Sequence, residues 1–158
     1  MYKRQDYYFL SISEFEKRVK NNEFIEYAKV YEDFKGLEII ELKKCIRTGG
    51  TTIIRTDLQG AKFWRDFSEE IIIILLTLEE DSLRERLLDR GSETSKQLKE
   101  RLAKSQEEQA HSNLNDYVIQ NNDGELHNTV SIIEEILRNE SKKTKKQNLY
   151  KNLEDYFI

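Results

Sequence analysis

The stretch "IIRTDLQGAKFW", Ile53 to Trp64, carries an apolar strand pattern into a helical one. The apolar pair is followed by Arg55 and Asp57, and then by a helical pattern over Leu58–Phe67. Short apolar runs such as Thr51–Thr56 are typical of strands buried on both faces of a parallel sheet. Because ligands bind beyond the carboxyl ends of such strands, we expect Asp57 to lie beside a ligand.

Outward from this stretch, strand and helix patterns alternate along the chain. Further strand patterns occur at Tyr7–Ser11, Phe24–Tyr31, Ile71–Leu76 and Tyr117–Gln120. Further helical patterns occur at Ser13–Asn22, Ile39–Gly49, Leu83–Arg90, Arg90–His111 and Leu126–Asn139. Strands that alternate with helices indicate βαβ units, so the predicted fold class is α/β.

Two of the predicted helices carry end signals. Ser13 is the predicted N-cap of the first helix, which should end near Asn21 and Asn22. Gly49 and Gly50 should end the second, since glycine accepts the backbone conformation that closes a helix.

Composition limits the classes of function. With 158 residues the chain has the size of one domain, and its net charge of −4 gives no reason to expect a nucleic-acid or membrane partner. A single cysteine, Cys45, excludes an internal disulfide and a cysteine-based metal site. The N-terminus lacks a signal-peptide core, and the longest apolar run, Ile71–Leu76, is too short to span a bilayer. We therefore expect a cytoplasmic protein.

Five segments, in order, resemble the guanylate kinases and together cover about Asp6 to Leu137. They are "DYYFLSISEFEKRVKNNEFIEYAKV", "TDLQGA", "LRERLLDRGSET", "KERLAKSQEE" and "DYVIQNND". The resemblance implies a parallel sheet like that of P-loop nucleoside monophosphate kinases, with helices on both faces and a small GMP-binding β subdomain. It divides the chain into a guanylate-kinase-like domain over 1–142, with the subdomain at 7–36 and the lid at 78–104, and a basic and aromatic tail over 143–158.

The resemblance also implies a GMP site. Tyr7 matches the tyrosine that holds the substrate phosphate, and Glu26 matches the glutamate that reads the guanine edge. A carboxylate suits guanine because it can accept two adjacent N–H donors. Gly36 is the retained glycine of the family's Y-G-S/T motif, and Asp57 matches the acid near the bound nucleotides and magnesium.

For phosphoryl transfer, the resemblance points to the lid and to the last strand. Arg86, Arg90 and Arg101 match or neighbour the arginines that stabilise the moving phosphoryl charge, and Asp57 joins them as a catalytic candidate. Asn121 matches the asparagine at the adenine side of ATP. The cofactors implied are ATP and Mg²⁺, and no metal ligands are assigned.

Several residues depart from the family pattern. Nothing matches the G-x-x-G-x-G-K-S/T loop that cradles ATP phosphates, so the predicted fold lacks the first strand and this loop. The phosphate-binding arginines upstream of Tyr7 are reduced to Arg4. Lys35 and Leu37 replace a tyrosine and a small hydroxyl residue, and Arg55 replaces an acid. An arginine there would repel magnesium and pair with Asp57 or with a phosphate.

These departures leave three interpretations of function. The chain is a truncated or degenerate guanylate kinase without full activity, a non-catalytic interaction module like the guanylate-kinase-like domains of scaffold proteins, or a fragment completed by a separately encoded N-terminal part. The replacements at Lys35 and Leu37 predict that this chain binds GMP weakly at most. The missing strand would expose sheet edges, which favours a protein partner, self-association, or cover by the tail.

Each candidate residue also has an ordinary explanation. Tyr7 can pack on a sheet, and Glu26 can be a solvated strand position. Asp57 can be a helix N-cap. Arg86 and Arg90 can form a salt-bridged helix face with the neighbouring Glu85 and Asp89.

Overall fold

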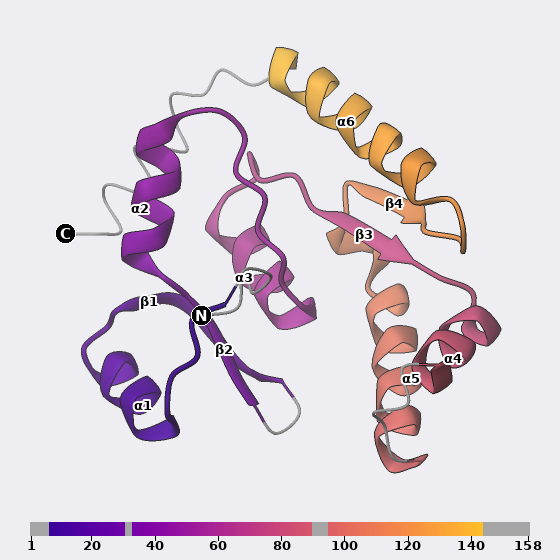
Figure 1. The fold of residues 1–158 in the computed structure, drawn as a ribbon. Coiled ribbons are helices and arrows are strands. Elements are labelled where there is room, and N and C mark those ends of the chain that lie inside the picture. Colours follow the sequence, from indigo (N-terminus) through magenta and orange to yellow (C-terminus); the bar gives the residue numbers. More distant parts are fainter. Residues whose placement is uncertain (1–6, 31–32, 90–94, 144–158) are drawn as a thin grey trace. The chain divides into compact units, whose positions relative to one another are not determined.

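The computed structural model describes residues 7–30, 33–89 and 95–143 (Figure 1). Arg4, Arg90 and the tail from residue 144 onward therefore lie outside the described residues. The chain divides into two compact units, Met1–Gly60 and Ala61–Ile158, and each is described by itself. The elements alternate between helix and strand, so the predicted α/β class is confirmed.

The first unit is built on an antiparallel hairpin flanked by two helices. Its elements are α1 (Ile12–Lys20), β1 (Phe24–Val30), β2 (Asp33–Glu38) and α2 (Ile39–Thr48). Phe15 of α1 is buried and stacks on Phe24 and Phe34, with ring centroids 4.5 and 5.3 Å apart. This aromatic cluster fixes α1 against the hairpin.

Helix α1 begins two residues earlier than the sequence predicts. Its N-cap is Ser11, whose hydroxyl accepts a hydrogen bond from the backbone N–H of Glu14. The prediction of Ser13 as the cap is wrong, because Ser13 already lies inside the first turn. The predicted end is confirmed, with Asn21 as the C-cap and Asn22 at a φ of 55°.

The predicted strand over Tyr7–Ser11 is wrong, because the structure assigns no strand there. The strand pattern at Phe24 is confirmed as β1, and β2, which was not predicted, pairs with it. Glu26 lies opposite Leu37, and Tyr27 lies opposite Gly36.

Helix α2 ends as predicted, since Gly49 is its C-cap with a φ of 72°. The segment that follows differs from the prediction: Thr51–Thr56 forms no strand. A strand needs a neighbour that supplies ladder hydrogen bonds, and no described residue bonds to this backbone in a ladder. Ile53 accordingly remains 74% exposed.

In its described residues, the second unit contains a two-stranded parallel sheet and four α-helices. It begins within α3 (Leu58–Phe67) and continues with β3 (Ile74–Thr77), α4 (Glu80–Asp89), α5 (Ser95–Ala110), a short 3₁₀ turn (Ser112–Leu114), β4 (Tyr117–Gln120) and α6 (Leu126–Lys143). β3 and β4 are parallel, and their register runs from Ile74 opposite Tyr117 to Thr77 opposite Gln120. The predicted parallel pair is confirmed, although β3 begins three residues later than predicted.

Asp116 ties three elements of this unit together at the start of β4. One of its carboxylate oxygens accepts hydrogen bonds from the backbone N–H of Ile73 (2.7 Å) and from Arg65 of α3 (2.6 Å). Arg65 also donates to the carbonyl oxygen of Leu114. The small core of this unit is formed by Trp64, Leu87, Leu102, Ile119 and Ile136.

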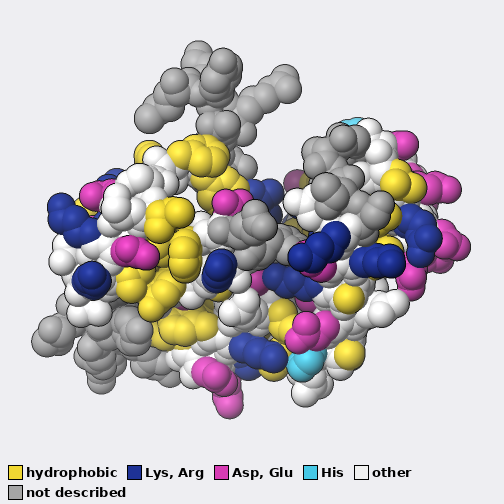
Figure 2. Space-filling model, turned by 90° about the horizontal axis from the view of Figure 1, so that it is seen from below, with side chains coloured by type: hydrophobic (Ala, Val, Ile, Leu, Met, Phe, Trp, Pro, Cys, Tyr) yellow, Lys and Arg dark blue, Asp and Glu magenta, His cyan; other side chains and the backbone are white. Residues whose placement is uncertain are grey.

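The surface carries both signs of charge. On the face drawn in Figure 2, lysine and arginine side chains are interspersed with aspartate and glutamate side chains. Within the described part of the chain, no helix combines the length and the apolar character needed to cross a bilayer.

Candidate functional site

The first unit brings Glu26 of β1 to the start of α3. An oxygen of its carboxylate lies 3.1 Å from the position that a Cβ atom would occupy at Gly60. The same position lies only 1.8 Å from the hydroxyl oxygen of Thr56. Gly60 is buried, and only the absence of a side chain leaves room here for both neighbours.

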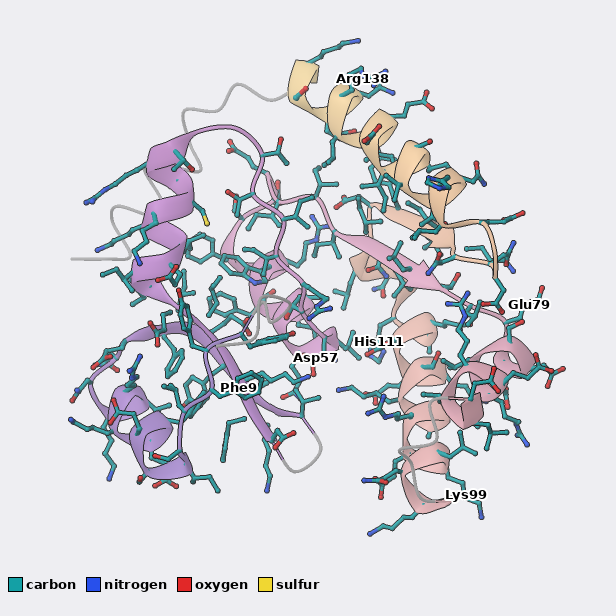
Figure 3. All side chains as sticks on the ribbon, in the orientation of Figure 1. Phe9, Asp57, Glu79, Lys99, His111 and Arg138 are labelled. Atoms are coloured by element: carbon teal, nitrogen blue, oxygen red, sulfur yellow. The ribbon has the colours of Figure 1, made fainter. Side chains whose placement is uncertain are left out.

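Asp57 caps the same helix end (Figure 3). Its Oδ1 accepts hydrogen bonds from the backbone N–H groups of Gln59 (3.1 Å) and Gly60 (3.2 Å). The N-cap explanation of Asp57 is therefore confirmed. The cap fixes the carboxylate in place at the first turn of α3.

The two acids interact electrostatically. Burial raises the pKa of the Glu26 carboxyl above its ordinary value, and the negative charge of Asp57 raises that pKa further. Among the described residues, no lysine or arginine forms an ion pair with Glu26. A half-buried carboxylate without a cationic partner is suited to accept N–H donors from a ligand.

Arg55 contacts Tyr7. Its Nη2 donates a hydrogen bond of 2.8 Å to the Tyr7 hydroxyl oxygen, and its guanidinium carbon lies 5.3 Å from the centroid of the Tyr7 ring. The Nζ of Lys35 lies 5.9 Å from the same centroid. Arg55 and Asp57 are both described, and no ion pair joins them. Arg55 thus turns to the tyrosine rather than to the neighbouring acid.

Gly36 lies where the hairpin strands approach closely. A Cβ atom there would lie 2.9 Å from the ring of Phe24 and 3.0 Å from the carbonyl oxygen of Glu26. The glycine therefore lets β2 pack against the strand that carries Glu26. Close packing of the strands therefore explains why a glycine stands at position 36. The role of Gly36 in GMP binding stays a prediction.

The second unit brings Arg86 and Asn121 together. Arg86 of α4 donates to the backbone carbonyl of Asn121 (2.8 Å) and forms an ion pair of 2.5 Å with Asp123. The side-chain oxygen of Asn121 accepts a hydrogen bond of 3.1 Å from the buried Thr129. Arg86 and Asn121 also line one shallow pocket with Leu76, Thr77, Leu83 and Leu87.

The structure says less about the two other arginines predicted for the lid region. Arg101 lies half-buried on α5, and Arg90 lies outside the described residues. The predicted salt-bridged face of α4 is wrong for Arg86, because its partner is Asp123 rather than Glu85 or Asp89. The ion pair joins α4 to the loop after β4.

The donor groups near Asp57 bear on whether this chain could hold a magnesium ion. Magnesium prefers oxygen ligands, usually one or two carboxylates together with substrate phosphates and water. Within the described ranges no three His, Cys, Asp or Glu side chains converge, and the cation Arg55 stands two residues before Asp57. The described residues therefore offer no cluster of three such ligands, and a magnesium ion here would depend on substrate phosphates and water for its other ligands.

Sequence reasoning missed three contributors to these arrangements. Thr56 and Gly60 determine the space around the Glu26 carboxylate. Lys35, like Arg55, lies within cation–π distance of the Tyr7 ring. The sequence of Gln59, Gly60 and Ala61 indicates the start of a helix, but it does not indicate that Glu26 approaches Gly60 closely. Lys35 stood out only as a departure from a motif, because its contact with Tyr7 depends on the hairpin.

Comparison with known proteins gives consistent matches. A family model described as guanylate kinase matches residues 3–140. The chain is 35% identical over 145 residues to "Guanylate kinase 2, chloroplastic/mitochondrial" of Oryza sativa subsp. japonica, covering 90% of this chain and 51% of that relative. It is 33% identical over 139 residues to the guanylate kinase of Rickettsia felis, covering 87% and 71%.

A solved structure supports the same assignment. The crystal structure of guanylate kinase from Anaplasma phagocytophilum aligns with a TM-score of 0.71 and 28% identity, over 99% of this chain and 77% of that one. The fold is thus of the nucleoside monophosphate kinase type. The chain spans about half the length of the rice relative and 64% of the Clostridium tetani guanylate kinase, to which it is 31% identical. On the family model, the relatives and the fold together, this chain belongs to the guanylate kinase family.

Proposed function

We propose that the chain binds guanosine monophosphate as the acceptor nucleotide of the reaction GMP + ATP → GDP + ADP. The observation that carries the proposal is the half-buried Glu26, which lies beside the glycine at the start of α3 and has no ion-pair partner among the described residues. The guanine edge presents two adjacent kinds of N–H donor, on the ring and on the exocyclic amino group. A carboxylate accepts both, and hydrogen bonds to a charged acceptor are the stronger ones.

In this proposal Asp57 contributes a negative charge at a fixed position near Glu26. Its oxygen is held by the helix cap, so its negative charge stays near the same end of α3. GMP that donates to Glu26 also offsets the repulsion between the two acids. Tyr7 is assigned to the phosphate of the nucleotide, and Gly36 to the close packing that supports the site.

The site is expected to bind GMP weakly. Leu37 lies opposite Glu26 in the hairpin, where the family pattern has a small hydroxyl residue. One lost hydrogen bond costs about 0.5–1.5 kcal/mol. The loss of the base hydroxyl and of the tyrosine replaced by Lys35 together predicts binding that is roughly ten- to hundredfold weaker.

Phosphoryl transfer is proposed to be deficient in these residues alone. The 158 residues contain no glycine-rich loop of the family form, which supplies the backbone N–H groups that hold ATP phosphates. Arg86, Arg90 and Arg101 are proposed to stabilise phosphoryl charge, and Asn121 to lie at the adenine side. Without the loop they do not hold ATP in line with GMP. The single cysteine also favours a reducing compartment such as the cytoplasm.

Calorimetric titration with GMP, IMP and AMP tests the base-binding proposal. GMP should bind more tightly than IMP, which lacks the exocyclic amino group, and more tightly than AMP. Glu26→Gln should weaken GMP binding about tenfold or more and remove the preference over AMP. Glu16→Gln makes the same chemical change at an exposed position of α1 and should leave binding unchanged. Equal affinity of wild type and Glu26→Gln for GMP would refute the proposal.

A coupled assay with ATP and GMP tests the catalytic part. The 158-residue chain should form ADP no faster than a control without protein. Turnover above this background, lost in Arg86→Gln, would show that these residues complete an ATP site by another route.

A further inference from the structure

We propose that Arg55, Lys35 and Tyr7 form a phosphate-binding cluster that takes the 5′-phosphate of the acceptor nucleotide. This inference rests on the proposed function and adds two residues to it, Arg55 and Lys35. Both are cations at positions where the family resemblance places an acid and a tyrosine. Where the family pattern has an acid and a tyrosine hydroxyl, the cluster thus supplies two positively charged hydrogen-bond donors.

The first support is the convergence of two cations on one aromatic ring. The guanidinium carbon of Arg55 and the ammonium nitrogen of Lys35 lie 5.3 and 5.9 Å from the centroid of Tyr7. These distances are within the range of cation–π attraction. Three segments that are far apart in the sequence therefore meet at one side chain in the first unit.

The second support is the absence of a neutralising acid. Among the described residues, no carboxylate forms an ion pair with Arg55 or with Lys35. Two like charges near one ring repel each other unless an anion lies between them. A phosphate monoester supplies that anion, since it carries nearly two negative charges near neutral pH.

The third support is the pattern of donors. Arg55 donates to the Tyr7 oxygen, so the tyrosine hydroxyl directs its own proton to another acceptor. Arginine has further N–H donors in a planar fork that fits phosphate oxygens, and lysine has three. Every group in the cluster thus has a donor for a phosphate oxygen. Tyr7 as a whole is 44% exposed.

The hairpin register relates this cluster to Glu26. Glu26 lies opposite Leu37, and Lys35 precedes Leu37 by two residues on β2. Because side chains alternate along a strand and opposed residues share a face, Glu26 and Lys35 lie on the same face of the hairpin. One face thus presents an acceptor for the guanine donors and, about 7 Å further along the strand, a cation for the phosphate.

This arrangement predicts which part of the ligand dominates binding. Leu37 offers no hydrogen bond to the base, whereas the cluster offers charged donors to the phosphate. Charge-assisted hydrogen bonds are roughly twice as strong as neutral ones. Removing the phosphate from the ligand should therefore weaken binding more than replacing guanine by another base.

The test titrates the full chain with GMP, guanosine and ribose 5-phosphate, and follows amide chemical shifts by NMR. Wild type should bind ribose 5-phosphate saturably, with shifts at Tyr7, Lys35 and Arg55. Arg55→Gln and Lys35→Gln should each weaken ribose 5-phosphate and GMP about tenfold, and leave guanosine within twofold. Arg47→Gln removes an exposed arginine from α2 in the same unit and should change none of the three affinities.

The two proposals fail in different ways in this experiment. If Glu26→Gln weakens guanosine and GMP while Arg55→Gln and Lys35→Gln leave GMP and ribose 5-phosphate at wild-type affinity, the cluster is refuted and the guanine site stands. If Glu26→Gln changes nothing while the cation variants weaken ribose 5-phosphate, the guanine site is refuted and the cluster stands. A wild type that does not bind ribose 5-phosphate refutes the cluster. Unchanged thermal melting of each variant shows that the loss lies in binding, and Arg55→Lys should retain part of the affinity.

Discussion

The carboxylate of Glu26 reaches the first turn of α3, where its Oε2 lies 3.1 Å from the position of a Cβ atom at Gly60. This contact depends on the glycine, because any side chain there would also meet the Thr56 hydroxyl at 1.8 Å. Glu26 and the start of α3 thus pack closely against each other. The hairpin and the segment that leads into α3 must keep their relative positions for the site to persist.

Gly60→Ala should therefore destabilise the protein and weaken GMP binding. The added methyl group must displace the Thr56 side chain and press on Glu26, and such overpacking typically costs about 1–3 kcal/mol. Urea denaturation measures the loss of stability, and calorimetry with GMP measures the loss of affinity.

Thr56→Ala combined with Gly60→Ala supplies the control. Removing the hydroxyl takes away the contact at 1.8 Å, so the double variant should recover part of the stability lost by Gly60→Ala alone. If the stability losses of the two single substitutions simply add in the double variant, the close approach of residue 60 to the Thr56 hydroxyl would be contradicted.

Glu26 should give the stability a distinctive pH dependence. Its pKa is raised in the folded protein by burial and by Asp57, so the folded state binds the proton more readily than the unfolded state. The free energy of unfolding should then fall as pH rises from the ordinary glutamate value of 4.5 through the raised pKa, and this penalty should persist above it. Glu26→Gln should thus be more stable than wild type at pH 7, with a difference that narrows toward pH 4.5.

Urea denaturation between pH 4.5 and pH 7 measures this difference. Glu16→Gln, at an exposed helix position, should show a flat difference over the same range. A Glu26→Gln variant that is less stable than wild type at pH 7 would contradict the raised pKa, because it would mean that the ionised carboxylate stabilises the fold.

Much of the fold could be predicted because local signals and the family resemblance agreed. The helix over Leu58–Phe67 has the predicted bounds, and the parallel pairing of the strands at Ile74 and Tyr117 was expected. Thr51–Thr56 shows the limit of such reasoning. Its apolar, β-branched pattern is a strand signal, but a strand exists only where a partner bonds to it.

The candidate site shows a similar division. Glu26 and Asp57 were proposed because they match acids of the resembling family, and the structure brings these two carboxylates into electrostatic contact. Arg55 and Lys35 were visible only as departures, 20 residues apart in a chain that alone does not show that they meet at Tyr7. Tertiary contacts decide such clusters, and sequence spacing does not.

Ser11 and Ser13 offer a direct test of the helix cap, which the sequence predicts at Ser13 and the structure places at Ser11. Ser11 accepts a hydrogen bond from the backbone N–H of Glu14, whereas Ser13 lies within the helix. Ser11→Ala should lower the free energy of unfolding by about 1 kcal/mol, the usual cost of losing an N-cap. Ser13→Ala should change it by less than half as much in the same urea titration. Equal losses would place the cap bond elsewhere.

Loss of the Asp116 carboxylate should destabilise the second unit. Its carboxylate accepts from the N–H of Ile73 at 2.7 Å and from Arg65 at 2.6 Å, so Asp116→Ala leaves a backbone donor and a guanidinium without that partner. Hydrogen bonds that involve a charged group contribute roughly 1.5–3 kcal/mol, and the loss should appear as a lower urea midpoint with early exchange of the β3 and β4 amide protons.

The matched control for Asp116 is the ion pair between Arg84 and Glu80 on α4. Its atoms are 3.9 Å apart and both side chains are 53% exposed, so Arg84→Gln should change stability by no more than about 0.5 kcal/mol. The contrast follows from geometry, because Asp116 joins α3 to the starts of two strands, whereas the Arg84–Glu80 ion pair joins two turns of one helix. An Asp116→Ala variant as stable as Arg84→Gln would mean that packing of Trp64 and Ile119, rather than this carboxylate, holds α3 to the sheet.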